Sequence, residues 1–192
     1  MSRRLLLSLT IFVLGLAGLA LASFMILSGQ QGVASGAIGG PFHLTAMDGR
    51  QVTDADFKGH PFLVFFGYTH CPDICPTVLF QISQVLKARG NDQQIKALFI
   101  SVDPERDTPA VMKKYLSSFD SRIIGLSGTR AETDAVEKEY RVYARKAPTQ
   151  GGDYAMDHTA VVYLMDKGGH FATAFNVDQS PKVAAKDLDS YL

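Results

Sequence analysis

The two cysteines of this 192-residue chain, Cys71 and Cys75, lie in the stretch GYTHCPDICPT and are the side chains best suited to chemistry. Three residues separate them, and a proline follows each one. If the stretch is helical, a spacing of four places both sulfurs on one face, with Cα atoms roughly 6 Å apart. That separation allows a disulfide bond, and it also suits a metal ion shared by both sulfurs. The pair therefore predicts a redox switch or a metal site.

The expected reactivity of the pair depends on the pKa of each thiol, because the thiolate both attacks disulfides and binds metals. Pro76 can occupy the first turn of a helix, so the cysteines are predicted to lie at a helix N-terminus. The positive end of the helix dipole and the free backbone N–H groups lower a thiol pKa there. We therefore expect thiols that ionise readily.

The available donors favour copper over zinc if the site holds a metal. A closed zinc site normally takes four ligands, and two cysteines cannot supply Cys₄ or Cys₃His. Two thiolates and one imidazole suit copper, because soft sulfur selects Cu(I) and imidazole serves either oxidation state. A simple stabilising disulfide is the alternative, although a domain of this size needs no such bond to be stable.

Of the five histidines, His158 is the best placed to complete such a site. It precedes the apolar run 159–165, which is predicted to be a strand. If that strand runs antiparallel to the run 61–68, its beginning faces the cysteines. His70 adjoins Cys71, but neighbouring side chains in a tight turn tend to diverge. The remaining histidines are expected at strand ends further from the cysteines. They are His43, His60 and His170.

The pattern of apolar runs predicts an α/β fold. The runs 61–68 and 95–102 are typical of central strands buried on both faces. Buried strands that alternate with helices indicate an α/β sheet, whose ligands lie beyond the carboxyl ends of the strands. The cysteines follow run 61–68 at that end. The other predicted elements are strands at 42–47, 51–53, 159–165 and 170–175, and helices that begin near Pro76, Thr108, Thr129 and Ser180.

Two further segments are predicted to be irregular. Residues 144–157 contain Pro148 and a glycine pair and are predicted to form a long loop, a kind of segment that is often functional. The stretch DPERDT at 103–108 is predicted to be a strand-to-helix turn, capped by Asp107 or Thr108. Recognition of a partner is the alternative role for this stretch.

The N-terminus carries the strongest compositional signal. Residues 5–27 have no charge and are long enough to cross a hydrocarbon core of about 30 Å at about 1.5 Å per residue. Arg3 and Arg4 precede this run, and the positive-inside rule places them in the cytoplasm. The predicted organisation is a cytoplasmic segment 1–4, a transmembrane anchor 5–27, a flexible tether 28–40 and a globular domain 41–192.

A cleaved signal peptide and a twin-arginine export signal are alternatives to this anchor, and each of them also exports the domain. The run begins too early for an organelle transit peptide. We therefore predict a single-pass protein of a bacterial inner membrane, with its soluble domain in the periplasm. The chain has 19 Lys+Arg and 19 Asp+Glu, so no basic excess indicates nucleic acid as a partner.

Four stretches of the chain together resemble the Sco family, also called SenC. This family comprises membrane-anchored, thioredoxin-fold copper proteins that help to assemble cytochrome c oxidase. FFGYTHCPDICPT at 65–77 resembles its metal motif, and FISVDPERDTP at 99–109 resembles a second signature. GGPFHL at 39–44 is similar to its entry strand, and YAMDHTAVVYLMD at 154–166 is similar to its histidine-bearing strand.

The resemblance implies a thioredoxin-like central sheet with flanking helices, preceded by one transmembrane helix. It also implies that Cys71, Cys75 and His158 bind copper as Cu(I), Cu(II) or both. The implied function is that of a metallochaperone, rather than an enzyme, which delivers copper to the copper-A site of a cytochrome c oxidase subunit. An upstream copper chaperone and a thiol reductase are further candidate partners.

The resemblance also allows a different activity, that of a thiol–disulfide oxidoreductase. In this alternative, Cys71 and Cys75 are a redox-active pair that reduces the copper-ligand cysteines of the oxidase subunit. His158 distinguishes the two hypotheses, because copper binding needs it and dithiol exchange does not.

Overall fold

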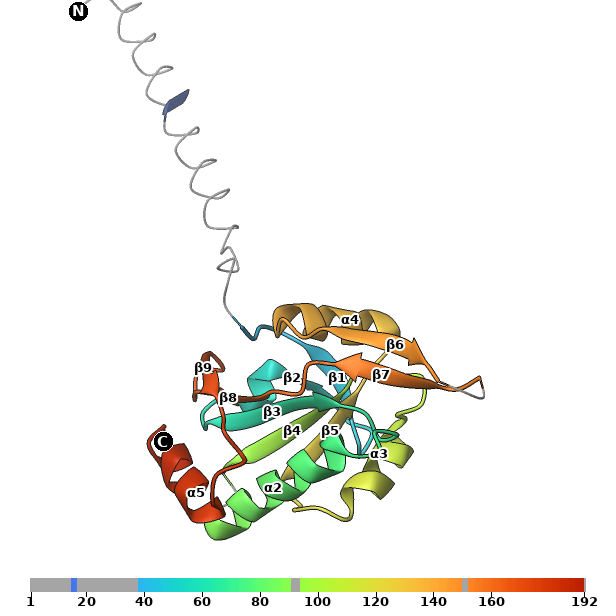
Figure 1. Cartoon of the computed structure of the whole chain (residues 1–192). Helices are drawn as coiled ribbons and strands as arrows, with labels where there is room; N and C mark the ends of the chain where they lie inside the picture. The colour runs from blue at the N-terminus through green and yellow to red at the C-terminus, as the bar shows by residue number, and fades with distance from the viewer. Residues whose placement is uncertain (1–14, 17–37, 91–93, 150–151, 192) are drawn as a thin grey trace, which may run out of the picture. The chain divides into compact units, whose positions relative to one another are not determined.

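The computed structural model describes residues 15–16, 38–90, 94–149 and 152–191 (Figure 1). The predicted cytoplasmic segment 1–4 lies outside these residues, as do nearly all of the predicted anchor 5–27 and tether 28–40. Within the described residues, no helix has both the length and the apolar character that crossing a membrane requires. The anchor therefore stays a prediction.

A seven-stranded sheet forms the centre of the domain, and a separate two-stranded hairpin extends beyond it (Figure 1). The sheet has the order β2-β1-β5-β4-β3-β8-β9, in which β3, β4 and β5 are parallel and β8 is antiparallel to β3. The hairpin pairs β6 with β7. The strands are β1 (His43–Ala46), β2 (Gln51–Thr53), β3 (Phe62–Gly67), β4 (Lys96–Ser101), β5 (Ile123–Ser127), β6 (Ala144–Pro148), β7 (Tyr154–His158), β8 (Val162–Met165) and β9 (Phe171–Ala174).

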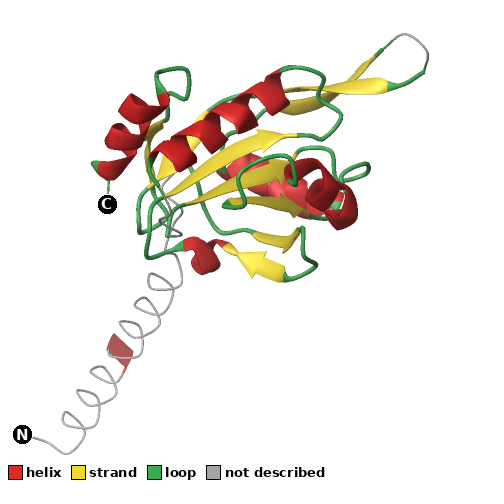
Figure 2. Cartoon of the chain, turned by 90° about the horizontal axis from the view of Figure 1, so that it is seen from below, coloured by secondary structure: helices red, strands yellow, loops and turns green. Residues whose placement is uncertain are grey.

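Helices cover both faces of the sheet, so the mixed α/β fold predicted from the sequence is confirmed. Figure 2 shows α2, α3 and α5 in front of the sheet, with α4 behind it. The central strand β3 is consequently buried along its whole length, as its apolar sequence predicts. The helical segments are the 3-10 helix η1 (Asp54–Phe57) and the α-helices α2 (Ile74–Ala88), α3 (Pro109–Leu116), α4 (Arg130–Glu139) and α5 (Pro181–Asp189).

The predicted helix starts are confirmed at α3 and α4. Thr108 accepts a hydrogen bond from the backbone N–H of Val111 and so caps α3. Thr129 and Glu132 form the predicted capping box of α4. Asp107 does not cap α3, because its carboxylate is buried and takes other partners.

One prediction is wrong, and one strand has no counterpart in the sequence prediction. The segment 144–157 is not a loop: its two arms pair in register as β6 and β7, and Pro148 ends an arm, a position that proline tolerates. Strand β5, which is not predicted from the sequence, is short and has Gly125 at its centre. A glycine weakens a strand on its own, so β5 depends on its pairing with β4 and β1.

Candidate metal centre

The cysteines lie where the sequence places them, beyond the carboxyl end of β3 and at the start of α2. Cys71 is half-buried in the connecting turn, and Cys75 is fully buried in the first turn of the helix. Gly67, the last residue of β3, makes this packing feasible. A Cβ atom at Gly67 would lie 2.8 Å from the Cys75 sulfur, closer than the two atoms can approach.

The hairpin brings His158 to the cysteines from 83 residues further along the chain. Its Nε2 atom lies 3.8 Å from the sulfur of Cys75. The Sγ atoms of Cys71 and Cys75 and a ring nitrogen of His158 all lie within 4.8 Å of one another. The structure thus brings the three candidate ligands of the sequence analysis together in one cluster.

The imidazole of His158 is oriented by the backbone beside it. Its Nδ1 atom lies 3.0 Å from the carbonyl oxygen of Thr159, which can only accept a hydrogen bond. Nδ1 therefore carries the proton, and Nε2 presents its lone pair to the thiol of Cys75. The edge of the Tyr68 ring also packs against the imidazole, at 5.8 Å between centroids and 87° between planes.

Burial sets the protonation of the cluster when no metal is bound. Desolvation raises the pKa of Cys75 far above that of an ordinary thiol. Desolvation also lowers the pKa of His158, which keeps the imidazole neutral and able to act as a ligand. The prediction of readily ionised thiols is therefore wrong for Cys75, because the burial of this thiol raises its pKa.

The other histidines do not join the cluster. His70 is exposed and its Nδ1 atom contacts the Thr69 hydroxyl at 3.2 Å. His43 and His170 lie beside carboxylates, those of Glu132 at 3.3 Å and Asp166 at 3.4 Å. Asp73, between the cysteines, is exposed and stands at the start of α2.

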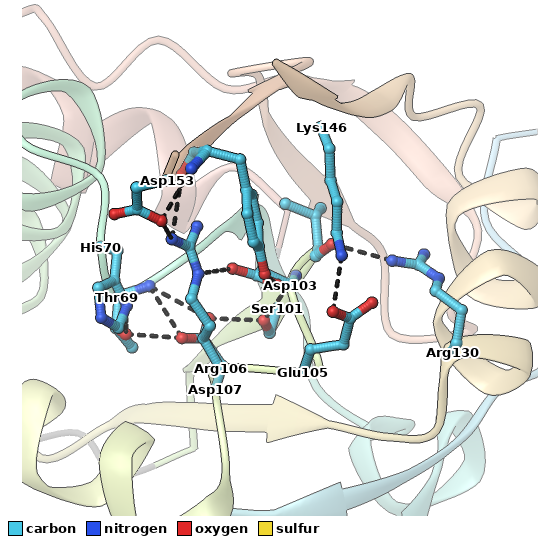
Figure 3. A network of polar contacts seen from close by, with 12 residues as sticks. Thr69, His70, Ser101, Asp103, Glu105, Arg106, Asp107, Arg130, Lys146 and Asp153 are labelled. Carbon is cyan, nitrogen blue, oxygen red and sulfur yellow. Dashed lines mark hydrogen bonds and ion pairs between the residues drawn. The ribbon is translucent and has the colours of Figure 1, made fainter. Parts of the chain in front are cut away.

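Sequence reasoning missed the residues that surround the cluster on its polar side. Arg106, from the DPERDT stretch, lies with its guanidinium carbon 3.8 Å from the centre of the Tyr154 ring and pairs with Asp103 (Figure 3). Asp107 accepts hydrogen bonds from Thr69, two residues before Cys71. The consecutive charged residues of DPERDT indicate that this stretch forms polar contacts, but the sequence does not show which distant residues these contacts involve.

The donor set fits a soft metal ion. Two thiols and one imidazole meet beyond the carboxyl end of β3. Within the described residues, they are the only grouping of at least three Cys, His, Asp or Glu side chains at ligand spacing. Soft sulfur donors select Cu(I), whereas oxygen-rich clusters suit magnesium or calcium. Three ligands also leave room for a fourth donor that another molecule supplies.

The parallel β3-α2-β4 unit, the antiparallel β8 and the two cysteines at the start of α2 define the class: a thioredoxin-like domain with a two-sulfur, one-imidazole centre. The SCO1/SenC family model matches residues 30–192, and the chain belongs to this family.

Relatives and solved structures agree with this assignment. The human protein SCO1 homolog, mitochondrial, is 36% identical over 167 residues, which cover 85% of this chain and 56% of the human protein. The chain thus spans little more than half the length of this relative.

Similar solved structures include members of the family with copper bound. Bradyrhizobium japonicum ScoI with copper bound is 61% identical, has a TM-score of 0.79, and is matched over 81% of this chain and all of its own. Yeast Sco1 with copper bound is 38% identical, with a TM-score of 0.73, over 81% of this chain and 88% of its own.

Proposed function

We propose that this protein is a copper metallochaperone that binds copper through Cys71, Cys75 and His158. The observation that carries the proposal is the meeting of the three donor atoms within 4.8 Å, with the lone pair of His158 turned toward Cys75. The copper-bound structures of Bradyrhizobium japonicum ScoI and yeast Sco1 support it.

The proposed recipient is the copper-A site of a cytochrome c oxidase subunit, as the resemblance to the Sco motifs implies. Cys71 is the more exposed of the two thiols, so an incoming thiolate of the recipient reaches the centre from that side. A metal held by three protein ligands can pass to another protein by stepwise ligand exchange, without release into water.

Replacement of the histidine tests the assignment. His158→Ala is expected to keep the fold and to lower the affinity for Cu(II) by more than about 100-fold, a larger loss than is typical for a residue that merely supports a ligand. Affinity is measured by competition with a chelator of known strength. His70→Ala is the matched control, because His70 adjoins Cys71 but is exposed and outside the cluster. Equal Cu(II) affinities in the two variants would show that His158 is not a copper ligand.

A thiol–disulfide oxidoreductase is the second candidate, favoured by the observation that both cysteines are free and their sulfurs share one cluster. In that reaction Cys71 and Cys75 give two electrons and two protons to a disulfide of the oxidase subunit and become a disulfide themselves. A separate thiol reductase then restores them. Rapid reduction of a disulfide substrate by copper-free His158→Ala would favour this candidate.

We also propose that residues 5–27 anchor the protein in a bacterial inner membrane and that the domain faces the periplasm. The uncharged run and the preceding Arg3 and Arg4 support this placement. Fractionation of cells that express the full chain, followed by protease treatment of spheroplasts, tests it. A domain that stays protected from protease in spheroplasts would contradict it.

A further inference from the structure

The loop at 103–107, between β4 and α3, contacts both segments that carry the proposed copper ligands. We call the segment 68–75, which contains both thiols, the cysteine arm. Strand β7 (Tyr154–His158), which ends at the imidazole, is the histidine arm. Figure 3 shows Asp107 beside Thr69 of the cysteine arm, and Arg106 beside Asp153, the residue before the histidine arm. The two arms are far apart in the sequence, so the loop is a physical link between them.

Arg106 holds the histidine arm with several contacts. Its guanidinium lies over the Tyr154 ring at 3.8 Å, and its Nη1 atom donates to the Tyr154 carbonyl at 3.0 Å and to Asp153 at 3.2 Å. Asp103 pairs with Arg106 and also accepts a hydrogen bond from the Tyr154 hydroxyl at 2.9 Å. Arg106 and Asp103 therefore hold the first residue of the strand by its ring, its hydroxyl and its backbone.

Arg106 also reaches the imidazole by a second path that does not follow the strand. Its guanidinium lies 5.8 Å from the centre of the Tyr68 ring. Tyr68 is buried, and its ring packs edge-on against the imidazole of His158. One arginine thus supports the histidine both from the far end of β7 and through an aromatic ring.

Asp107 holds the cysteine arm from the neighbouring position. Its buried carboxylate accepts the Thr69 hydroxyl and the Ser101 hydroxyl, each at 2.6 Å, and the Thr69 backbone N–H at 3.1 Å. Consecutive residues of one short loop therefore fix the two arms relative to each other.

We propose that Arg106 is a positioning residue that holds the imidazole of His158 at the thiol pair and thereby makes the centre competent for Cu(II). The inference rests on the proposed copper-binding function. Two thiolates can hold Cu(I) by themselves because soft sulfur prefers that ion, whereas Cu(II) depends more strongly on the imidazole. A displaced histidine arm therefore weakens Cu(II) binding selectively.

Arg106→Lys is the direct test. Lysine keeps the charge but lacks the planar fork that stacks on Tyr154 and donates to two acceptors at once. We expect the affinity for Cu(II) to fall by about 10–100-fold, as is usual when a group that orients a ligand is replaced. We expect the affinity for Cu(I) to stay close to that of the unmodified protein. The sulfur-to-Cu(II) charge-transfer absorption should shift, and amide hydrogen exchange in β7 of the metal-free protein should accelerate.

Arg130→Lys is the matched control. Arg130 also contacts this region, through the carbonyl of Val102 at 3.1 Å, but its other contacts are with Asp134 and Glu137 on its own helix. The Arg130→Lys variant is expected to keep the affinities for Cu(I) and Cu(II) and the sulfur-to-Cu(II) charge-transfer absorption unchanged. Tyr154→Phe removes only the hydroxyl bonded to Asp103 and serves as a milder variant should Arg106→Lys fail to fold. It is expected to lower Cu(II) affinity in the same direction, and no change there would then overturn the proposal.

Two results for a folded Arg106→Lys protein would overturn the positioning role. One is unchanged Cu(II) affinity, and the other is an equal loss of Cu(I) and Cu(II) that follows a lower melting temperature. The proposed function fails separately, if the unmodified protein binds no copper or if His158→Ala binds it normally.

Discussion

The metal centre and the 103–107 loop lie next to each other, but their polar atoms differ in how well they are hydrogen-bonded. In the centre, the Cys71 sulfur accepts a 3.3 Å contact from the Cys75 backbone N–H, and the lone pair of His158 faces a thiol 3.8 Å away. In the loop, the buried carboxylate of Asp107 accepts three short hydrogen bonds. Ligand atoms that make few hydrogen bonds can bind a metal ion, whereas polar atoms that are fully hydrogen-bonded stabilise the fold.

This contrast predicts that substitutions in the two regions affect different properties, copper affinity in one and stability in the other. Changes at Cys71 and His158, the two half-buried ligands, should lower copper affinity with little loss of stability, because these side chains make few internal hydrogen bonds. Changes that leave buried polar groups of the loop without partners, such as a change at Asp107, should lower stability first.

The largest expected effect is that of Cys71→Ser. Serine keeps an oxygen that can accept from the Cys75 N–H, so the fold should persist, and Cys71 is half-buried. The variant loses one soft ligand, and copper affinity should fall by more than about 100-fold, beyond the loss typical of supporting residues. Chelator competition measures the affinity, and a urea titration measures the stability. A stability loss with intact copper binding would reverse the contrast between the two regions.

The next effect is that of Asp107→Asn. The carboxylate faces only donors, from Thr69 and Ser101, and an amide replaces one acceptor oxygen with another donor. We expect the free energy of unfolding to fall by about 2 kcal/mol, the usual cost of leaving a buried polar group unpaired. The folded variant should still bind copper at the normal stoichiometry in the cold. A variant that kept its stability but bound no copper would place Asp107 in the metal site instead.

The sequence revealed the centre more completely than its surroundings. The cysteine spacing and the apolar run before it indicated a redox or metal site, and strand direction made His158 the best-placed histidine. The resemblance to the Sco family then implied that these three residues act together. The proposed anchor at 5–27 rests on composition alone.

The supporting contacts were not predictable in the same way. The hairpin that carries His158 has half-exposed and charged residues, so no apolar pattern marks it as two strands. Arg106 meets Tyr154 across 48 residues, and a string of charges does not say which partner each one takes. The high pKa of Cys75 also depends on tertiary burial, which local helix chemistry does not include.

The smallest expected effect is that of Glu105→Gln, in the same loop as Asp107. Glu105 forms an ion pair with Lys146 of β6 at 2.6 Å, but both side chains are about half exposed to solvent. Water and salt screen such a pair, and ordering two long side chains offsets most of the attraction. We therefore expect no measurable change in the urea midpoint or in either copper affinity, at low or high salt. A loss comparable to that of Asp107→Asn would show that charge pairing, rather than buried hydrogen bonding, makes this loop a support for the metal centre.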